Sequence, residues 1–112
     1  MNMSEKEQKI YDIIKQAVEV LNRTKGWTLD LWEVNFGLGT DTELNGLVLL
    51  ATVVITNTKA KKELRLLFPE SYFRPDIPNI KDVDAGIIRL KDDDKVIARI
   101  AYIIWLNRGR II

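Results

Sequence analysis

Residues 47–56, with the sequence LVLLATVVIT, decide the fold. Apolar side chains occupy both sets of alternating positions in this stretch, so a strand formed here is apolar on both faces. Strands of this kind lie in the interior of a sheet, because each face needs cover. We therefore expect a long central strand, and the rest of the chain has to supply its neighbours and its cover.

The N-terminal segment predicts an amphipathic helix over about residues 5–24. Ser4 and Glu7 have the spacing of a capping box, in which a hydroxyl and a carboxylate satisfy opposite backbone N–H groups at the helix start. Gly26 follows the last helical residues, where a glycine often ends a helix. The apolar stripe at helical spacing consists of Ile10, Ile13, Ile14, Ala17, Val18 and Leu21.

Two further strands are expected beside the central one. Alternating side chains predict a strand over residues 31–36, followed by a polar, glycine-rich loop at 37–46. After the central strand, a polar segment and a strand at 63–68 predict a hairpin, because two β-type stretches joined by a polar loop usually pair. In that hairpin one face carries Leu64, Leu66 and Phe68. The alternative is a short helix over residues 59–68 that turns inward Ala60, Leu64, Leu67 and Phe68.

The last part of the chain carries a proline-rich loop and two more expected strands. All 3 prolines fall within residues 69–78, which predicts a loop. Strands are expected at 83–90 and 95–106, joined by an aspartate turn at 91–94. The β-branched residues of 95–106 favour a strand, although a helix with aspartates at its start and Gly109 beyond its end is the alternative.

These elements predict one α+β domain over residues 1–112. One N-terminal amphipathic helix packs on an antiparallel sheet of about five strands, joined mostly by hairpins as in a meander. A single helix with a narrow apolar stripe covers only part of one sheet face, yet the strands expected at 47–56 and 96–106 are apolar on both sides. The surplus has to be buried by sheet curvature, by a second sheet layer or by another chain.

Composition excludes several classes of chemistry. The 112 residues are 46% hydrophobic and 29% charged, as in globular proteins, and the formal charge of +1 gives no strong overall attraction to nucleic acid or lipid. The chain has no cysteine and no histidine, which removes thiol and imidazole catalysis, disulfides and thiolate metal sites. No metal and no cofactor is expected, and no spacing forces two carboxylates together, so we predict that the protein is not an enzyme. Cysteine-free composition fits the cytoplasm, and neither a signal peptide nor a membrane span is expected.

Two motifs suggest ligand sites but have simpler structural explanations. The aspartates at 92–94, with Asp82 and Asp84 nearby, suggest a site for Mg²⁺ or Ca²⁺, but the glycine and distal glutamate of an EF-hand loop are missing. A solvated hairpin turn is therefore favoured there. Gly37 and Gly39 follow a strand as in phosphate-binding loops, but a third glycine at the required spacing is absent, which favours a hairpin connection.

Basic residues in two segments suggest a surface that binds the phosphates of a nucleic acid. Phosphate contacts alone give strongly salt-dependent binding without base recognition. No aromatic residue is interleaved with these lysines, so the stacking platform of single-strand binders is not expected there. A solvated loop and a soluble terminus are the simpler interpretation. The residues are Lys59, Lys61, Lys62 and Arg65, offset by Glu63, together with Arg108 and Arg110.

Aromatic residues mark a candidate surface for a protein partner. Tyr72, Phe73 and Arg74 lie between prolines and have the composition of interface hot spots, although the two rings alternatively fold back as a lid on the core. Trp105, near the end of the sequence, is either a core anchor or a dimer contact. One or two of the tryptophans are expected in the core, and the set is Trp27, Trp32 and Trp105.

These observations predict a non-enzymatic protein-interaction or regulatory accessory protein, homodimeric or part of a complex, that uses Tyr72, Phe73, Arg74 and Trp105. The alternative is a nucleic-acid-binding accessory protein that acts through the basic residues. A small-molecule carrier with an apolar cavity between the helix and a curved sheet is a third possibility. A mobile-element origin suits so small a factor. Abundant isoleucine and little glutamine are mildly typical of thermophilic proteins, whereas the number of asparagines argues against a thermophilic source.

Overall fold

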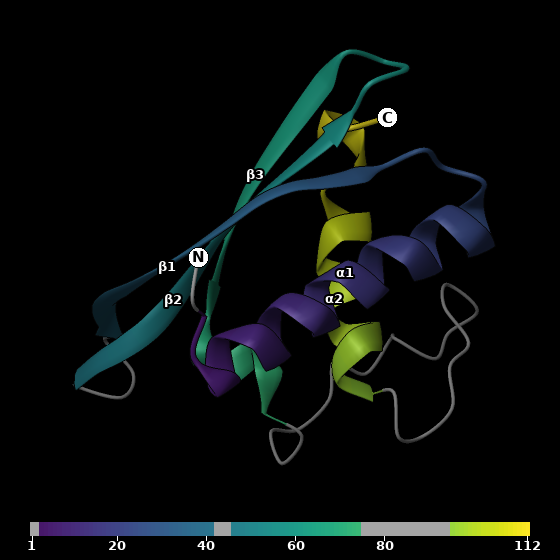
Figure 1. Cartoon of the computed structure of the whole chain (residues 1–112). Coiled ribbons are helices and arrows are strands. Elements are labelled where there is room, and N and C mark those ends of the chain that lie inside the picture. The colour runs from purple at the N-terminus through teal and green to yellow at the C-terminus, as the bar shows by residue number, and fades with distance from the viewer. Residues whose placement is uncertain (1–2, 42–45, 75–94) are drawn as a thin grey trace.

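The computed structural model describes residues 3–41, 46–74 and 95–112, and Figure 1 shows how they are arranged. Within these residues, a three-stranded antiparallel sheet with the order β1-β2-β3 shares one core with two α-helices. The α+β class is therefore confirmed, as is an N-terminal helix packed on an antiparallel sheet. The elements in chain order are α1 (Glu5–Lys25), β1 (Asp30–Asp41), β2 (Gly46–Asn57), β3 (Lys62–Pro69), the 3-10 helix η1 (Glu70–Phe73), α2 (Lys95–Leu106) and the 3-10 helix η3 (Arg108–Arg110).

Helix α1 begins and ends where its sequence signals predicted. The Ser4 side chain accepts from the backbone N–H of Glu7 at 3.1 Å, and the Ser4 N–H donates to the Glu7 carboxylate at 2.9 Å, which completes the capping box. Gly26 ends the helix in the left-handed conformation, with φ 69°, and its N–H donates to the carbonyl of Asn22 at 3.1 Å. The apolar stripe of α1 lies in the core.

Strand β2 lies at the centre of the sheet, as its composition predicted. Val53 of β2 stands opposite Val34 of β1 and Leu66 of β3, and the predicted hairpin between β2 and β3 is confirmed. Lys61 in the turn of that hairpin has a φ of 55°. Alternate residues of β2 face the helices and are buried in the core, namely Ala51, Val53 and Ile55.

Residues 95–106 form helix α2, so the prediction of a strand there was wrong. Ile97, Ile100, Ala101 and Ile104 recur at helical spacing and pack on the core cluster, whereas a strand would have placed Leu106 on its apolar face, where it is instead exposed. The preference of β-branched residues for strands is weak, and the packing of one apolar helix face overrides it.

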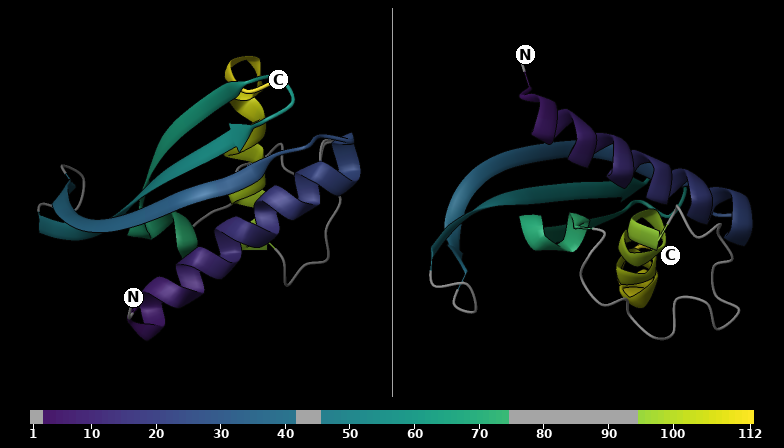
Figure 2. Two further views of the ribbon diagram at one scale, coloured as in Figure 1. Left: turned by 45° about the horizontal axis from the view of Figure 1, so that its top comes forward. Right: turned by 90° about the horizontal axis from the view of Figure 1, so that it is seen from below.

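The sheet has three strands among the described residues, and not about five. Of the two expected strands that the sheet lacks, the one at 95–106 is a helix instead. The other, at 83–90, and the turn at 91–94 lie outside the described residues. Helix α2 packs against α1 and adds its own buried side chains to the core (Figure 2). The apolar surplus on the helix side of the sheet is therefore largely buried within the chain.

Strand β1 continues to Asp41, so the prediction of a loop beginning at residue 37 was wrong. Gly37 and Gly39 pair with Leu50 and Val48 of β2. A Cβ atom at Gly39 would overlap the Leu50 side chain, which occupies the space that the glycine leaves open. Gly39 makes room for the Leu50 side chain, whereas a Cβ atom at Gly37 would meet no neighbour, and the two paired glycines do not form a phosphate-binding loop.

Candidate interaction surfaces

Helix α2 fixes the η1 segment, which carries three of the predicted partner contacts. Arg99 is 4% exposed, and its Nη1 donates to the carbonyl oxygens of Tyr72 at 2.8 Å and Arg74 at 2.9 Å. The rings of Tyr72 and Phe73 both meet Phe68 edge-on, with centroids 6.2 and 5.9 Å apart. Phe73 packs partly buried against the core, while Tyr72 and Arg74 stay exposed.

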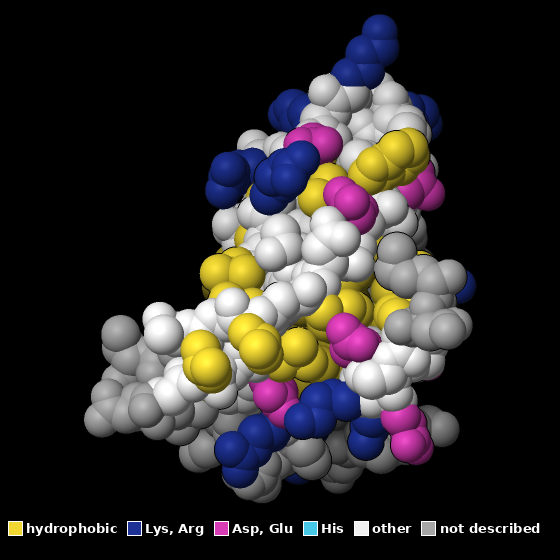
Figure 3. Space-filling view, turned by 60° about the vertical axis from the view of Figure 1, so that its left-hand side comes forward, with side chains coloured by type: hydrophobic (Ala, Val, Ile, Leu, Met, Phe, Trp, Pro, Cys, Tyr) yellow, Lys and Arg dark blue, Asp and Glu magenta, His cyan; other side chains and the backbone are white. Residues whose placement is uncertain are grey.

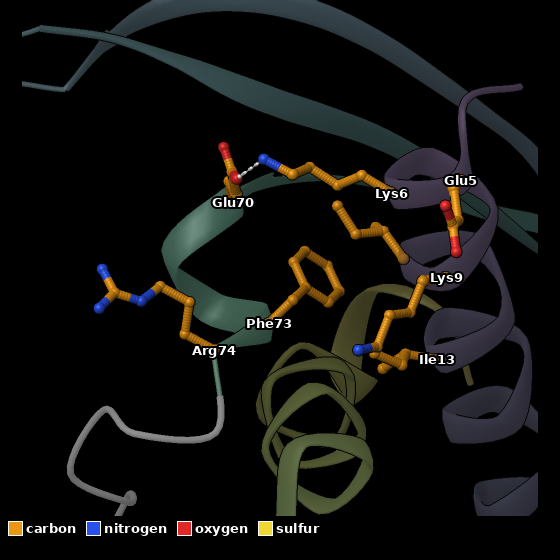
Figure 4. Close-up of a pocket in the computed structure, with 8 residues that line it drawn as sticks. Glu5, Lys6, Lys9, Ile13, Glu70, Phe73 and Arg74 are labelled. Carbon is orange, nitrogen blue, oxygen red and sulfur yellow. Dashed lines mark hydrogen bonds and ion pairs between the residues drawn. The ribbon is translucent and has the colours of Figure 1, made fainter.

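An open groove of about 470 Å³ separates η1 from the N-terminal half of α1. Phe73 points across it toward α1, and Ile13 lines the opposite wall (Figure 4). An ion pair of 2.6 Å between Lys6 Nζ and Glu70 Oε1 spans the rim. The hydrogen bond from Lys6 holds the pKa of Glu70 below its ordinary value, although burial acts in the opposite direction. This groove is open and carries charges of both signs, unlike the apolar cavity expected of a small-molecule carrier.

Trp105 lies partly buried against the core at the end of α2. Its ring stacks on Tyr102 with centroids 6.1 Å apart, and the guanidinium of Arg108 lies 3.6 Å from its centroid. Trp105 thus packs against the edge of the core beside an exposed arginine, and a dimer contact at this residue stays a prediction. Of the other two tryptophans, Trp27 packs on the core and Trp32 is 71% exposed on β1.

The fold brings the two basic segments of the sequence to one end of the molecule. Lys62 donates to the carbonyl of Ile112 at 2.6 Å, and Asn57 donates to the carbonyl of Ile111 at 2.8 Å, which ties η3 to the turn between β2 and β3. Figure 3 shows Lys and Arg side chains gathered toward this end, at its top. We call this surface the basic end, and it consists of Lys59, Lys61, Lys62, Arg108 and Arg110. Arg65 stands further along β3 and pairs with Glu63 at 3.3 Å.

A cleft at the basic end contains an aromatic residue that the sequence did not associate with the lysines. It has a volume of about 280 Å³, and Trp27 and Lys59 both line it, together with Thr28 and Asn57. Trp27 follows the glycine that ends α1, and the lysine belongs to the turn after β2. No spacing in the sequence links these residues, because only the folding of the chain brings their segments together.

The hairpin of β1 and β2 extends beyond the helices (Figures 1 and 2), and this part carries exposed apolar residues. Leu38 and Leu47 are 72% and 71% exposed, although they continue the same face of the sheet that the helices cover further along. Figure 3 shows hydrophobic side chains along this part of the surface. We call Leu38 and Leu47 the hairpin patch. Leu67, on the opposite face of the sheet, and Trp32, at the bulge of β1, are also exposed.

The candidate cation site at the aspartates is not tested by the described structure. The aspartates at 82, 84 and 92–94 lie outside the described residues. Among the residues that the structure describes, no group of three or more acidic, histidine or cysteine side chains is placed to hold a metal ion. None of the described helices combines the length and the apolar character needed to cross a membrane.

Comparison with known proteins gives no relative. No protein-family model, no curated protein and no solved structure matches this chain. The interaction surfaces therefore have to be interpreted from their own geometry and chemistry.

Proposed function

We propose that this chain is a non-enzymatic protein-interaction module that forms a homodimer through the free edge of β1. The observation that carries the proposal is that β1 is an edge strand in the described part of the sheet. Strand β1 is 12 residues long, and among residues 3–41, 46–74 and 95–112 it pairs with β2 alone, on one side. An edge strand of this length presents a row of unpaired backbone groups, and natural proteins usually block such an edge.

The two edge strands of the sheet differ in the devices that prevent pairing. Strand β3 carries Lys62 and Arg65 and ends in Pro69, and η3 lies against it. Strand β1 contains no lysine, arginine or proline. Its acidic residues and its bulge, between Leu31 and Glu33, lie near its two ends, and α1 contacts it. Charged residues and prolines are common means of protecting an edge, so β3 is guarded, whereas residues 34–40 of β1 carry neither. A second copy of the chain is therefore expected at β1.

The sequence of β1 selects one register for the pairing of two copies. In an antiparallel pair centred on Phe36, each Val34 stands opposite the Leu38 of the second copy, and the two phenylalanines meet on the axis. Val34, Phe36 and Leu38 lie on the same face of the sheet as Leu47, the other residue of the hairpin patch. A register centred on Gly37 would instead place Glu33 opposite Asp41, and like charges directly opposite each other are unfavourable.

Pairing of this kind also accounts for the hairpin patch. Leu38 is covered by the second copy, and the exposed apolar face of the hairpin continues across the dimer axis. Stable dimers bury roughly 800 Å² on each partner. Strand pairing alone provides part of this area, and apolar side chains next to the axis provide more. Tyr72 and Arg74 remain exposed in such a dimer as predicted contacts for a further protein.

A disulfide tests the register, because the chain has no cysteine of its own. In the proposed register, a Phe36→Cys variant places two thiols opposite each other, with Cα atoms about 4.5–5.5 Å apart, which suits a disulfide. We expect mild oxidation to link this variant into a covalent dimer. The matched control is Leu67→Cys, an exposed position on β3 that should remain monomeric on a denaturing gel.

Native mass spectrometry gives a second measurement that does not disturb the core. Leu38→Lys places a charge at an exposed position, so the fold is retained, but the dimer should weaken by tenfold or more. Leu67→Lys is the control and should leave the dimer unchanged. A wild-type chain that stays monomeric at 100 µM, as an assay concentration, would refute the homodimer. A dimer that only Leu67→Lys disrupts would keep the homodimer but reject the β1 edge.

Binding of nucleic acid at the basic end is a second candidate function. The specific observation in its favour is that the fold joins two basic segments that are far apart in the sequence. Cations grouped on one surface bind phosphates through release of counterions, whatever the net charge of the whole chain. The affinity for an oligonucleotide should therefore fall steeply when the salt concentration of the assay is raised from about 50 to about 200 mM. An affinity that does not depend on the salt concentration would reject this candidate.

A further inference from the structure

The cleft at the basic end combines the two groups that single-strand binding requires. Trp27 supplies an aromatic ring and Lys59 supplies a cation, and both residues line the cleft. Proteins that bind single strands hold the phosphates with basic side chains and stack the bases on aromatic rings. The cleft therefore provides the aromatic residue that is not interleaved with the lysines in the sequence.

The surroundings of the cleft supply further cations at short range. Lys61 follows Lys59 in the same turn, and Lys62 begins β3. The carbonyl of Ile112, which lines the cleft, accepts from the Lys62 ammonium at 2.6 Å. Arg110 precedes this segment in the chain. Lys59 in the cleft and Lys62 beside it therefore provide cations next to the place where an inserted base would lie.

Hydrogen-bonding groups in the cleft suit the edge of a base. Thr28 is exposed and offers its hydroxyl, whereas Asn57 Oδ1, 3.5 Å from that hydroxyl, already accepts from the Ala60 N–H. The backbone around Gly26 leaves open space, because a Cβ atom built there meets no neighbour within 4 Å. An unpaired base can enter a cleft of this kind, whereas the bases of a duplex are stacked and paired.

We propose that the cleft binds a base of a single-stranded nucleic acid, stacked on Trp27, with the neighbouring phosphates held by the basic end. This inference rests on the second candidate function, nucleic-acid binding. It adds the class of ligand and the residue that contacts the base.

The test compares two ligands of equal backbone charge. Fluorescein-labelled oligothymidylate of 15 nucleotides and an abasic phosphodiester of the same length are titrated with the wild-type chain at low salt, and anisotropy is measured. Stacking of one base should make the thymidylate bind roughly tenfold tighter. Equal affinity for both ligands would overturn the role of Trp27 while keeping the nucleic-acid candidate. Failure of both ligands to bind would reject the nucleic-acid candidate itself.

Two substitutions locate the site on the surface. Trp27→Phe should keep the preference for thymidylate, and Trp27→Leu should remove it without changing the affinity for the abasic ligand. Lys59→Gln should weaken both ligands and lower the salt dependence, since one phosphate contact is lost. The control is Lys15→Gln on α1, which is also exposed and should change neither affinity. Because Trp27 packs on the core, circular dichroism is used to verify that each variant is folded. If Trp27→Leu unfolds, the comparison of the two ligands on the wild-type chain decides the question.

Discussion

Replacement of Asn57 by alanine should destabilise the fold far more than the loss of an exposed polar side chain. Asn57 is 7% exposed and joins three segments of the chain. Its Nδ2 donates to the Ile111 carbonyl at 2.8 Å, and its Oδ1 accepts from the Ala60 N–H at 3.2 Å and from the Thr28 hydroxyl at 3.5 Å. The side chain therefore holds the turn after β2, the C-terminal segment and the segment after α1 together.

The size of the effect follows from what each partner loses. Ile111 is fully buried, so its carbonyl is left without this donor, which costs about 1–3 kcal/mol. Ala60 is exposed, and water replaces its lost acceptor, so this bond contributes about 0.5–1 kcal/mol. The contact with Thr28 is long and adds little. The free energy of unfolding should therefore fall by about 1.5–4 kcal/mol.

Equilibrium unfolding in urea, followed by tryptophan fluorescence, measures this loss. The midpoint should fall while the dependence on urea stays constant, because the surface exposed on unfolding is unchanged. Asn35→Ala is the matched control, since Asn35 is exposed on β1 and should change stability by less than about 0.5 kcal/mol. An Asn57→Ala variant as stable as this control would refute the reasoning, because it would mean that the three segments hold together without the amide.

Two smaller effects are expected at the ends of α1. Gly26→Ala should cost about 1–2 kcal/mol in urea unfolding, because φ 69° is strained for alanine although the space is open, whereas Gly109→Ala, with no such φ, should be neutral. Glu70→Gln removes the ion pair with Lys6 and should lower stability at pH 7 by at most about 1 kcal/mol, since both side chains are partly exposed. The pKa of Glu70 is lower in the folded state than its ordinary value, so this stabilisation is present above that value and is lost as the pH falls through the lowered one. Wild type and Glu70→Gln should therefore converge in acid, and a difference that persists at pH 2 would contradict the ion pair as its cause.

The elements that the sequence predicted correctly are those with local signals. Helix α1 carries its own cap at Ser4, its own stop at Gly26 and one apolar stripe between them. The hairpin of β2 and β3 combines two β-type stretches with a polar turn. In each case the residues that determine the structure are close together in the sequence, so the pattern is visible without knowledge of the rest of the fold.

Helix α2 could not be identified in the same way because its apolar residues fit both periods. Ile100 and Ile104 occur in the helical stripe and also in the alternating strand pattern. What decides between them is long-range packing: α2 meets α1 and holds η1 through the buried Arg99. In a strand that is apolar on both faces, burial of the charged Arg99 would have been unfavourable. In helix α2, its guanidinium donates to the carbonyl oxygens of Tyr72 and Arg74.

The candidate surfaces show the same division between local and long-range information. Composition alone was enough to find the basic residues and Tyr72 with its neighbours. The meeting of Lys59 with Trp27, and the contrast between the open β1 edge and the guarded β3 edge, depend on the order of strands in the sheet. No pattern in one sequence reports that order, so both proposals became visible only in the folded structure.

The two proposals constrain each other through the direction of β1. The strand begins at Asp30, opposite Thr56 and beside the turn that carries the basic end. Antiparallel pairing centred on Phe36 therefore sends the two basic ends of a dimer to opposite sides of the axis. At about 3.4 Å per residue, each end lies roughly 20 Å from the axis, and the two are about 40 Å apart along the strands. A strand of nucleic acid long enough to reach both would be held at two points, which raises affinity without a new contact. Dimerisation at β1 and base binding at Trp27 are thus compatible, because neither surface occludes the other.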